Sequence, residues 1–226
     1  MQNDPYDDGG SDISVTRLID SPRIATLAKR HKNELEADAS ERLWALAGQA
    51  MHLLLERSNK DGVVEKRFHT TILGWDVSGQ VDWLVGSRIE DWKWCSAWNA
   101  VFKSSHQKWE DQLNCLACLA RLNGHEVNEV AINAIYRDWT ASKAGDSKYP
   151  PIPAERIPFQ VWPQEDALAY MTKRVELHQL AEEVLPLCSN EDRWQDKRTG
   201  AFRRCERYCS VARFCTQWER EKPNVG

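Results

Sequence analysis

The sequence predicts an α/β domain in which helices flank a central mixed sheet, followed by a helical segment that contains cysteines. The first observation is the order of the apolar patterns, which runs from helical to strand-like, back to helical and then to a strand again. The second is the length of 226 residues, which suits one principal domain with a small appendage. The third is the composition, 42% hydrophobic and 28% charged, which is typical of a globular protein rather than a disordered or membrane chain.

The chain divides into three regions by composition. Residues 1–12 are acidic and lack the basic and apolar parts of a secretory signal, so we expect a flexible tail. We place the main domain at 13–187 and a cysteine-rich C-terminal segment at 188–226. Because no apolar run approaches the roughly 20 residues that cross a bilayer, we expect a cytoplasmic protein with no membrane partner.

The first half of the main domain changes from helical to strand-like character. Residues 13–32 have apolar side chains at helical spacing, interrupted by Ser21 and Pro22. The apolar run 43–55 predicts a buried helix. Residues 63–94 are rich in Val, Ile, Trp and Thr and contain three well-spaced glycines, which predicts a three-stranded meander.

The second half alternates between helix and strand. Residues 108–123 place apolar side chains on one helical face, and Gly124 fits the end of that helix. Residues 127–139 alternate like a strand. The Tyr-Pro-Pro-Ile-Pro sequence at 149–153 predicts a rigid extended linker, and 164–187 predicts a long amphipathic helix.

A hairpin in the meander brings two acidic residues together. Residues 86–87, Gly-Ser, suit a two-residue turn of type II′, which has glycine at its first central position. If that turn closes the hairpin, Val85 faces Arg88. Counting back along both strands then places Asp82 opposite Asp91, with both carboxylates on one face.

The two negative charges would repel each other, because directly opposed side chains have Cβ atoms only about 4.5 to 5.5 Å apart, so a positive charge must lie nearby. A divalent cation such as Mg²⁺ would supply it, and Lys93 lies on the same face as Asp91 because strand side chains alternate. Glu90 falls on the opposite face, so we exclude it from a metal site. The alternative is an exposed salt-bridge cluster, against which the apolar surroundings of these strands argue.

Three stretches, in this order, resemble the RecB-like branch of the PD-(D/E)XK nucleases, which includes CRISPR-associated and phage exonucleases. Residues 48–56 resemble the G-x-x-x-H-x-x-x-E helix of that family and include His52. Residues 79–93 resemble its G-x-x-D segment and the following apolar-D-x-K strand. Residues 109–114 resemble its W-x-x-Q-L-N helix and include Gln112.

The resemblance implies a restriction-endonuclease-like core that hydrolyses phosphodiesters with Mg²⁺ or Mn²⁺. It implies that His52, Asp82 and Asp91 hold the metal, that Lys93 assists the attacking water and that Gln112 orients the centre. Taken alone, His52 would more often be a core histidine and Gln112 a polar helix residue. The family often has a tyrosine four residues after the glutamine, where this chain has leucine, so a substrate contact from that position is not expected.

The C-terminal cysteines also predict a bound metal. The spacing of Cys205, Cys209 and Cys215 suggests a metal rather than disulfides in a chain without a secretory signal. The family often ends in three such cysteines that hold an iron–sulfur cluster with a fourth from upstream of the core. No cysteine precedes Cys95 here, so Cys188 is the nearest fourth ligand, for a [4Fe-4S] cluster or Zn²⁺. The alternative is that the three cysteines Cys205, Cys209 and Cys215 are unliganded and partly buried. We expect the cysteines of the main domain to be packing residues: Cys95, Cys115 and Cys118.

Basic residues gather near the C-terminus although the net charge is −4. That net charge argues against coating nucleic acid through bulk electrostatics, but a local groove is compatible with it. Arg203, Arg204 and Arg207 could line a DNA groove, and a solvated charged terminus is the alternative. The eleven tryptophans are expected mostly in the core, although an exposed one could stack on single-stranded bases.

The sequence therefore favours a DNA exonuclease acting on ends or single strands in recombination or end processing. Other recombination or replication proteins are the expected partners, and a phage-encoded enzyme would act in the host cytoplasm. A second hypothesis is a catalytically inactive DNA-binding or assembly protein that keeps the nuclease fold. A third is a metal-stabilised interaction module whose functional part is the cysteine-rich segment.

Overall fold

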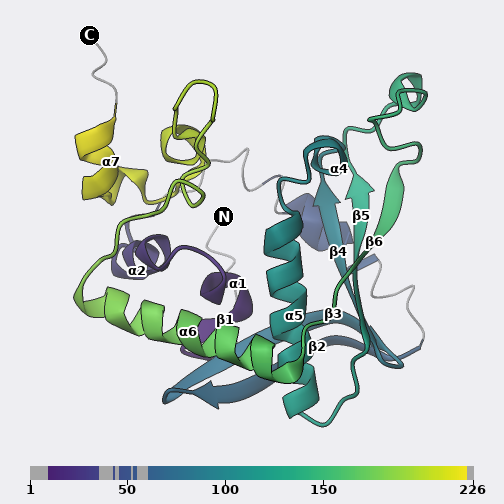
Figure 1. Cartoon of the computed structure of the whole chain (residues 1–226), viewed down its shortest axis with the longest axis horizontal. Coiled ribbons are helices and arrows are strands. Elements are labelled where there is room, and N and C mark those ends of the chain that lie inside the picture. Colours follow the sequence, from purple (N-terminus) through teal and green to yellow (C-terminus); the bar gives the residue numbers. More distant parts are fainter. Residues whose placement is uncertain (1–9, 36–42, 44–45, 52, 55–60, 223–226) are drawn as a thin grey trace.

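A computed structural model of the chain describes residues 10–35, 43, 46–51, 53–54 and 61–222. Its centre is a six-stranded sheet with the order β1-β3-β4-β5-β6, in which β2 also pairs with β3 (Figure 1). The pairs β1–β3 and β4–β5 are parallel and the others are antiparallel, so the mixed sheet is as predicted. The strands are β1 (Ile13–Ser14), β2 (Val63–Ile72), β3 (Trp75–Val85), β4 (Arg88–Cys95), β5 (Glu129–Tyr136) and β6 (Ala154–Phe159).

Helices cover one face of this sheet. The α-helices are α1 (Val15–Leu18), α2 (Pro22–Arg30), α4 (Trp98–Phe102), α5 (His106–Leu122), α6 (Gln164–Glu183) and α7 (Thr216–Glu221). Helix α5 packs on the strands β2 to β5, and α6 packs against α5, α1 and α2 (Figure 1). The main hydrophobic core lies between α5 and the sheet, and a second small core joins α2 to the C-terminal segment. No helix in the described part of the chain is long and apolar enough to cross a membrane.

The predicted meander is confirmed as β2, β3 and β4. Gly86 has φ of +56°, and Ser87 is not among the described residues with positive φ, as a type II′ turn requires. Val85 pairs with Arg88, so the predicted register of the hairpin is also confirmed. The turn chemistry alone therefore fixes which side chains share a face of β3 and β4.

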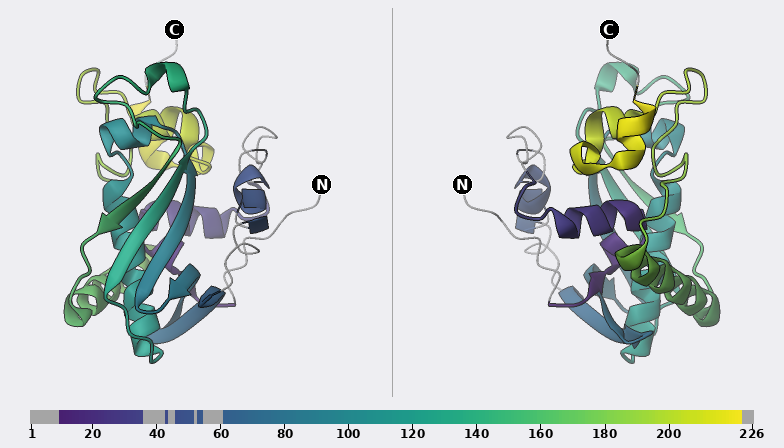
Figure 2. Two further views of the ribbon diagram at one scale, coloured as in Figure 1. Left: turned by 90° about the vertical axis from the view of Figure 1, so that its right-hand side faces the viewer. Right: turned by 90° about the vertical axis from the view of Figure 1, so that its left-hand side faces the viewer.

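Several elements differ from the prediction. Ile13–Ser14, predicted as part of a helical segment, form strand β1, which pairs with β3. The segment predicted as a buried helix is helical at residues 46–51, but Leu46, Leu53 and Leu54 are exposed, and Figure 2 shows the segment on the side away from α6. Helix α6 ends at Glu183 rather than 187, since the chain turns extended before a proline. Strand β6 was not predicted, because it contains Pro158, and a proline argues against a strand in a sequence pattern. The structure accommodates this proline because β6 is an edge strand.

Gly79 lets α5 lie directly on β3. A Cβ atom at this position would lie 2.6 Å from Cδ2 of Leu116 and 2.9 Å from Cδ1 of Leu119, both buried on α5. This close approach holds α5 against the strand that carries Asp82. The glycine of the G-x-x-D segment therefore has a packing role.

We expect Gly79→Ala to lower the free energy of unfolding by about 1 to 3 kcal/mol, as overpacking of a core does. Urea denaturation followed by circular dichroism measures this change. Gly145→Ala is the matched control, because a Cβ there meets no atom within 4 Å. Equal stability of the two variants would show that α5 does not approach β3 as closely as described.

Candidate active site

The two carboxylates of the hairpin lie where β3 and β4 separate. The ladder between these strands ends at the pair Trp83–Glu90, one residue before Asp82 and Asp91. Beyond it, β4 continues beside β5, whereas β3 curves away (Figure 1). The main-chain N–H of Trp92 donates to Oδ2 of Asp82 at 2.8 Å, so a carboxylate takes the place of the next ladder bond.

Asp91 is buried at the centre of this group. Its side chain is 2% exposed, and its Oδ2 lies 2.6 Å from Nζ of Lys93. The Nε2 amide of Gln112, on α5, donates to Oδ1 of Asp91 at 3.2 Å. The structure thus brings together the strand residues and the helix residue that the sequence singled out separately.

The charges of Asp91 and Asp82 both act on the ammonium of Lys93. Burial acts to lower the pKa of its ammonium, but the charges of Asp91 and Asp82 outweigh burial and raise that pKa above its usual value. Lys93 is therefore a cation at neutral pH. It can donate hydrogen bonds to an anionic group, but it has no free lone pair with which to accept a proton.

The residues of this site fit a divalent cation. Oδ2 of Asp91 is buried and accepts no hydrogen bond of good geometry from the described residues; the ion pair with Lys93 is its compensation. Carboxylate oxygens are the ligands that Mg²⁺ and Mn²⁺ prefer. The described residues contain no group of three or more His, Cys, Asp or Glu side chains disposed to hold a metal ion. The predicted third ligand, His52, lies outside the described residues.

Glu90, the acidic residue next to Asp91, lies outside the candidate site. Glu90 is 6% exposed on the other face of β4, where its Oε1 pairs with Nε of Arg88 at 2.6 Å and Nε of Arg156 at 3.0 Å. Burial acts to raise the pKa of Glu90, but hydrogen bonds and these charges lower it. Glu90 therefore lies away from Asp82 and Asp91, as the alternation of strand side chains predicted.

Leu116 occupies the position at which the family often has a tyrosine. It is 1% exposed within the core, so it cannot contact a substrate.

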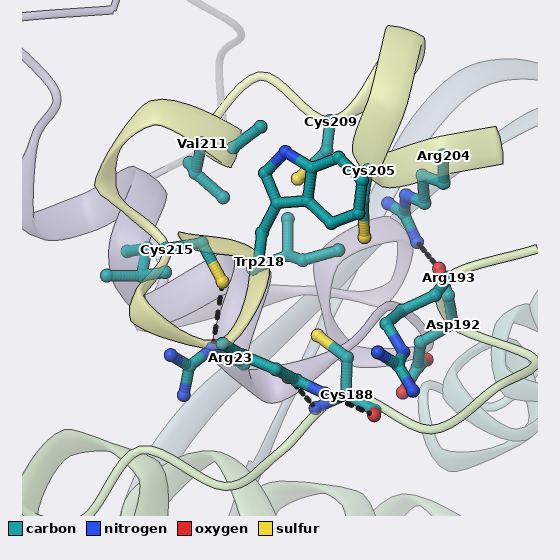
Figure 3. Close-up of a pocket in the computed structure, with 14 residues that line it drawn as sticks. Arg23, Cys188, Asp192, Arg193, Arg204, Cys205, Cys209, Val211, Cys215 and Trp218 are labelled. Atoms are coloured by element: carbon teal, nitrogen blue, oxygen red, sulfur yellow. Dashed lines mark hydrogen bonds between the residues drawn. The ribbon is translucent and has the colours of Figure 1, made fainter. Parts of the chain in front are cut away.

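The four C-terminal cysteines line one cavity. Figure 3 shows the sulfur atoms of Cys188, Cys205, Cys209 and Cys215 around this cavity, with Trp218 beside them. Burial and the neighbouring thiols raise the pKa of Cys205 to about 11. The chemistry of this donor set fits a thiolate-bound metal, although these sulfurs, like the other described donors, are not placed to hold a single ion. The other three cysteines are buried, as predicted for packing residues: Cys95, Cys115 and Cys118.

A buried arginine that the sequence did not suggest lies beside this cavity. Arg23, on α2, is 3% exposed, and its Nε donates to Sγ of Cys215 at 3.2 Å (Figure 3). Its guanidinium also donates to the carbonyl oxygen of Pro186 at 3.0 Å and to the hydroxyl of Thr216 at 2.9 Å, both neutral. A buried guanidinium needs a negative partner, and an ionised, metal-bound sulfur would supply one.

The three arginines proposed for DNA binding have different surroundings. Arg204 is 13% exposed and donates to both carboxylate oxygens of Asp20 at 3.0 and 2.8 Å. Arg203 pairs with Asp196. Arg203 is nevertheless exposed, as is Arg207. These two side chains are accessible to a phosphate, whereas Arg204 is largely buried against Asp20.

The fold is similar to that of a solved structure, the crystal structure of SSO0001. The two structures superpose with a TM-score of 0.56 and 17% sequence identity, over 90% of this chain and 85% of that chain. This likeness shows a shared α/β fold. The sequence matches no known family profile and no curated protein.

Proposed function

We propose that this protein is a metal-dependent DNA nuclease, an exonuclease acting on DNA ends or single strands. The observation that carries the proposal is the fork between β3 and β4, where Asp82, a buried Asp91 and a cationic Lys93 meet. Two carboxylates that could hold a metal ion, together with a lysine, suit phosphodiester hydrolysis. The metal and the ammonium would stabilise the negative charge of the substrate and of its transition state. A role in recombination or end processing follows from the resemblance of the three motifs.

Hydrolysis adds water across one P–O ester bond: the oxygen of water joins phosphorus, and the leaving oxygen takes up a proton and departs as a hydroxyl. Mg²⁺ or Mn²⁺ at Asp82 and Asp91 would neutralise the charge of the phosphate and make water easier to deprotonate. Lys93 would leave its ion pair with Asp91 and donate to the attacking water or to a non-bridging phosphate oxygen. Gln112 would hold the orientation of the Asp91 carboxylate through its hydrogen bond. His52 is proposed as a further ligand on the resemblance alone.

We further propose that Cys188, Cys205, Cys209 and Cys215 hold a [4Fe-4S] cluster or Zn²⁺ as a structural cofactor. The shared cavity and the buried Arg23 beside Cys215 support this assignment. Such a group would fasten the C-terminal segment to α2, because Arg23 belongs to that helix.

The experiment is an incubation of the anaerobically purified protein with end-labelled single-stranded and duplex DNA. Mg²⁺, Mn²⁺ or EDTA is added, and the products are separated on a denaturing gel. Cleavage that requires the metal supports the nuclease, and the product ladder gives its polarity. If the protein binds the DNA but leaves it intact, the nuclease proposal is wrong. The alternative, a non-catalytic DNA-binding or assembly protein, would then be favoured.

A further inference from the structure

Two exposed aromatic rings lie just beyond the proposed catalytic strand. Helix α4 follows β4 within three residues of Cys95 and has no buried residue. Trp98 is 46% exposed and Phe102 is 70% exposed. Their rings are stacked, with centroids 5.7 Å apart and an interplanar angle of 20°. Solvent exposure of two large rings in one short helix calls for a ligand or partner, since folding of the helix does not bury them.

This pair stands at the edge of the sheet where β4 and β5 both end. The strands are parallel, with Cys95 beside Tyr136, so the segments that follow them meet. Asp138, after β5, accepts hydrogen bonds from the Ser96 hydroxyl at 2.7 Å and the Ala97 amide at 2.6 Å, before α4. These contacts hold α4 at the carboxyl end of the strand that carries Lys93. Lys93 lies two residues before the end of β4, and α4 begins three residues after that end.

The surroundings of the rings are basic. The segments 96–105 and 137–149 contain four cations, Lys103, Arg137, Lys143 and Lys148, and two acids, Asp138 and Asp146, in a chain of net charge −4. The two acids accept local hydrogen bonds. Nζ of Lys143 lies 5.5 Å from the ring centroid of Trp98 and 5.9 Å from that of Tyr149. A positive charge is thus held over the aromatic surface itself.

We propose that Trp98 and Phe102 form a stacking platform for the bases of single-stranded DNA, with Lys143 contacting the phosphate backbone. Phe102 presents the more open ring, on which an unpaired base extends the existing stack. Flat aromatic surfaces combined with nearby cations suit single-stranded nucleic acid, because every base has a stacking face and duplex bases are already stacked. This inference rests on the proposed function and specifies its substrate: a single strand that leads to the site at β3 and β4.

The test measures binding in EDTA, where a metal-dependent enzyme cannot cleave. Fluorescence anisotropy compares a labelled oligothymidylate, an abasic strand of equal length and a duplex, at one salt concentration. The variants are the double variant Trp98→Ala/Phe102→Ala and the single variant Phe102→Trp. Leu180→Ala is the control for loss of an exposed apolar side chain, since Leu180 lies on α6 and is 56% exposed. Circular dichroism and the melting temperature confirm that each variant is folded.

We expect the double alanine variant to lose about 10-fold or more in affinity for the oligothymidylate, as loss of a stacked base does. It should also lose the wild-type preference for that strand over the abasic one, while Phe102→Trp and Leu180→Ala retain both. Unchanged affinity and base preference in the double variant would overturn the platform, even if the wild type cleaves DNA. A shift from dimer to monomer in sedimentation with unchanged DNA affinity would overturn it too, in favour of an interface between two copies. Absence of both binding and cleavage in the wild type would remove the proposed function together with the platform.

Discussion

Asp91→Asn is expected to reduce metal-dependent cleavage of DNA by about three orders of magnitude, the scale on which several kcal/mol of transition-state stabilisation is lost. The substitution keeps the size of the side chain and removes the charge that faces Lys93 at 2.6 Å. The amide can still accept a hydrogen bond from Gln112, so the local packing is retained. The measurement is the initial rate of product release from end-labelled DNA with Mn²⁺.

Glu129→Gln is the matched control for this variant. It makes the same carboxylate-to-amide change on the neighbouring strand β5, at a side chain that is 62% exposed. We expect its cleavage rate to equal that of the wild type. A rate for Asp91→Asn as high as that of the control would place the hydrolytic centre elsewhere in the chain.

Replacing Cys209 or Cys188 with serine is expected to abolish metal binding by the C-terminal segment. Both side chains line the cavity that Cys205 and Cys215 share, and four thiolates bind either about four iron atoms as a cluster or about one zinc. Elemental analysis and the visible absorption spectrum of anaerobically purified protein distinguish these contents. Because metal binding contributes to folding, the melting temperature should fall with the metal content.

Cys95→Ala is the control for the loss of a buried thiol, since Cys95 lies at the end of β4 and outside the cavity. It should keep the full metal content. A wild type that contains no metal when prepared anaerobically, and whose four cavity thiols all react with an alkylating reagent after unfolding, would contradict the assignment and leave them as packing residues.

The local part of the site was predictable because a two-residue turn and the alternation of strand side chains define it. Gly86 sets the register from Val85–Arg88 to Trp83–Glu90, and Asp82 and Asp91 are the next residues along the two strands. The pattern did not predict that the strands separate at this point: β4 stays paired with β5 from Arg88 to Cys95, whereas its pairing with β3 ends at Glu90. The burial of Asp91 also depends on that packing, which sequence spacing does not describe.

Long-range contacts explain what the sequence did not predict. Arg23 and Cys215 are 192 positions apart, and no local pattern marks an arginine on a short helix as the partner of a thiol. An apolar period shows that a helix has an apolar face but not what covers it, so the segment containing Leu46, Leu53 and Leu54 was wrongly predicted to be buried. The same limitation applies to Trp98, whose residue type favours the core although its helix contains no fully buried residue.

The most direct test of the acidic centre is a Mn²⁺ titration followed by electron paramagnetic resonance, in which the signal of free Mn²⁺ disappears on binding. We predict that the wild type binds Mn²⁺ at this centre and that Asp91→Asn binds it at least about 10-fold more weakly. Lys93→Met should bind Mn²⁺ at least as tightly as the wild type, because its ammonium no longer competes for Oδ2 of Asp91, although it should not cleave DNA. Equal Mn²⁺ affinity in the wild type and Asp91→Asn, or loss of binding in Lys93→Met, would contradict a metal site built on these carboxylates.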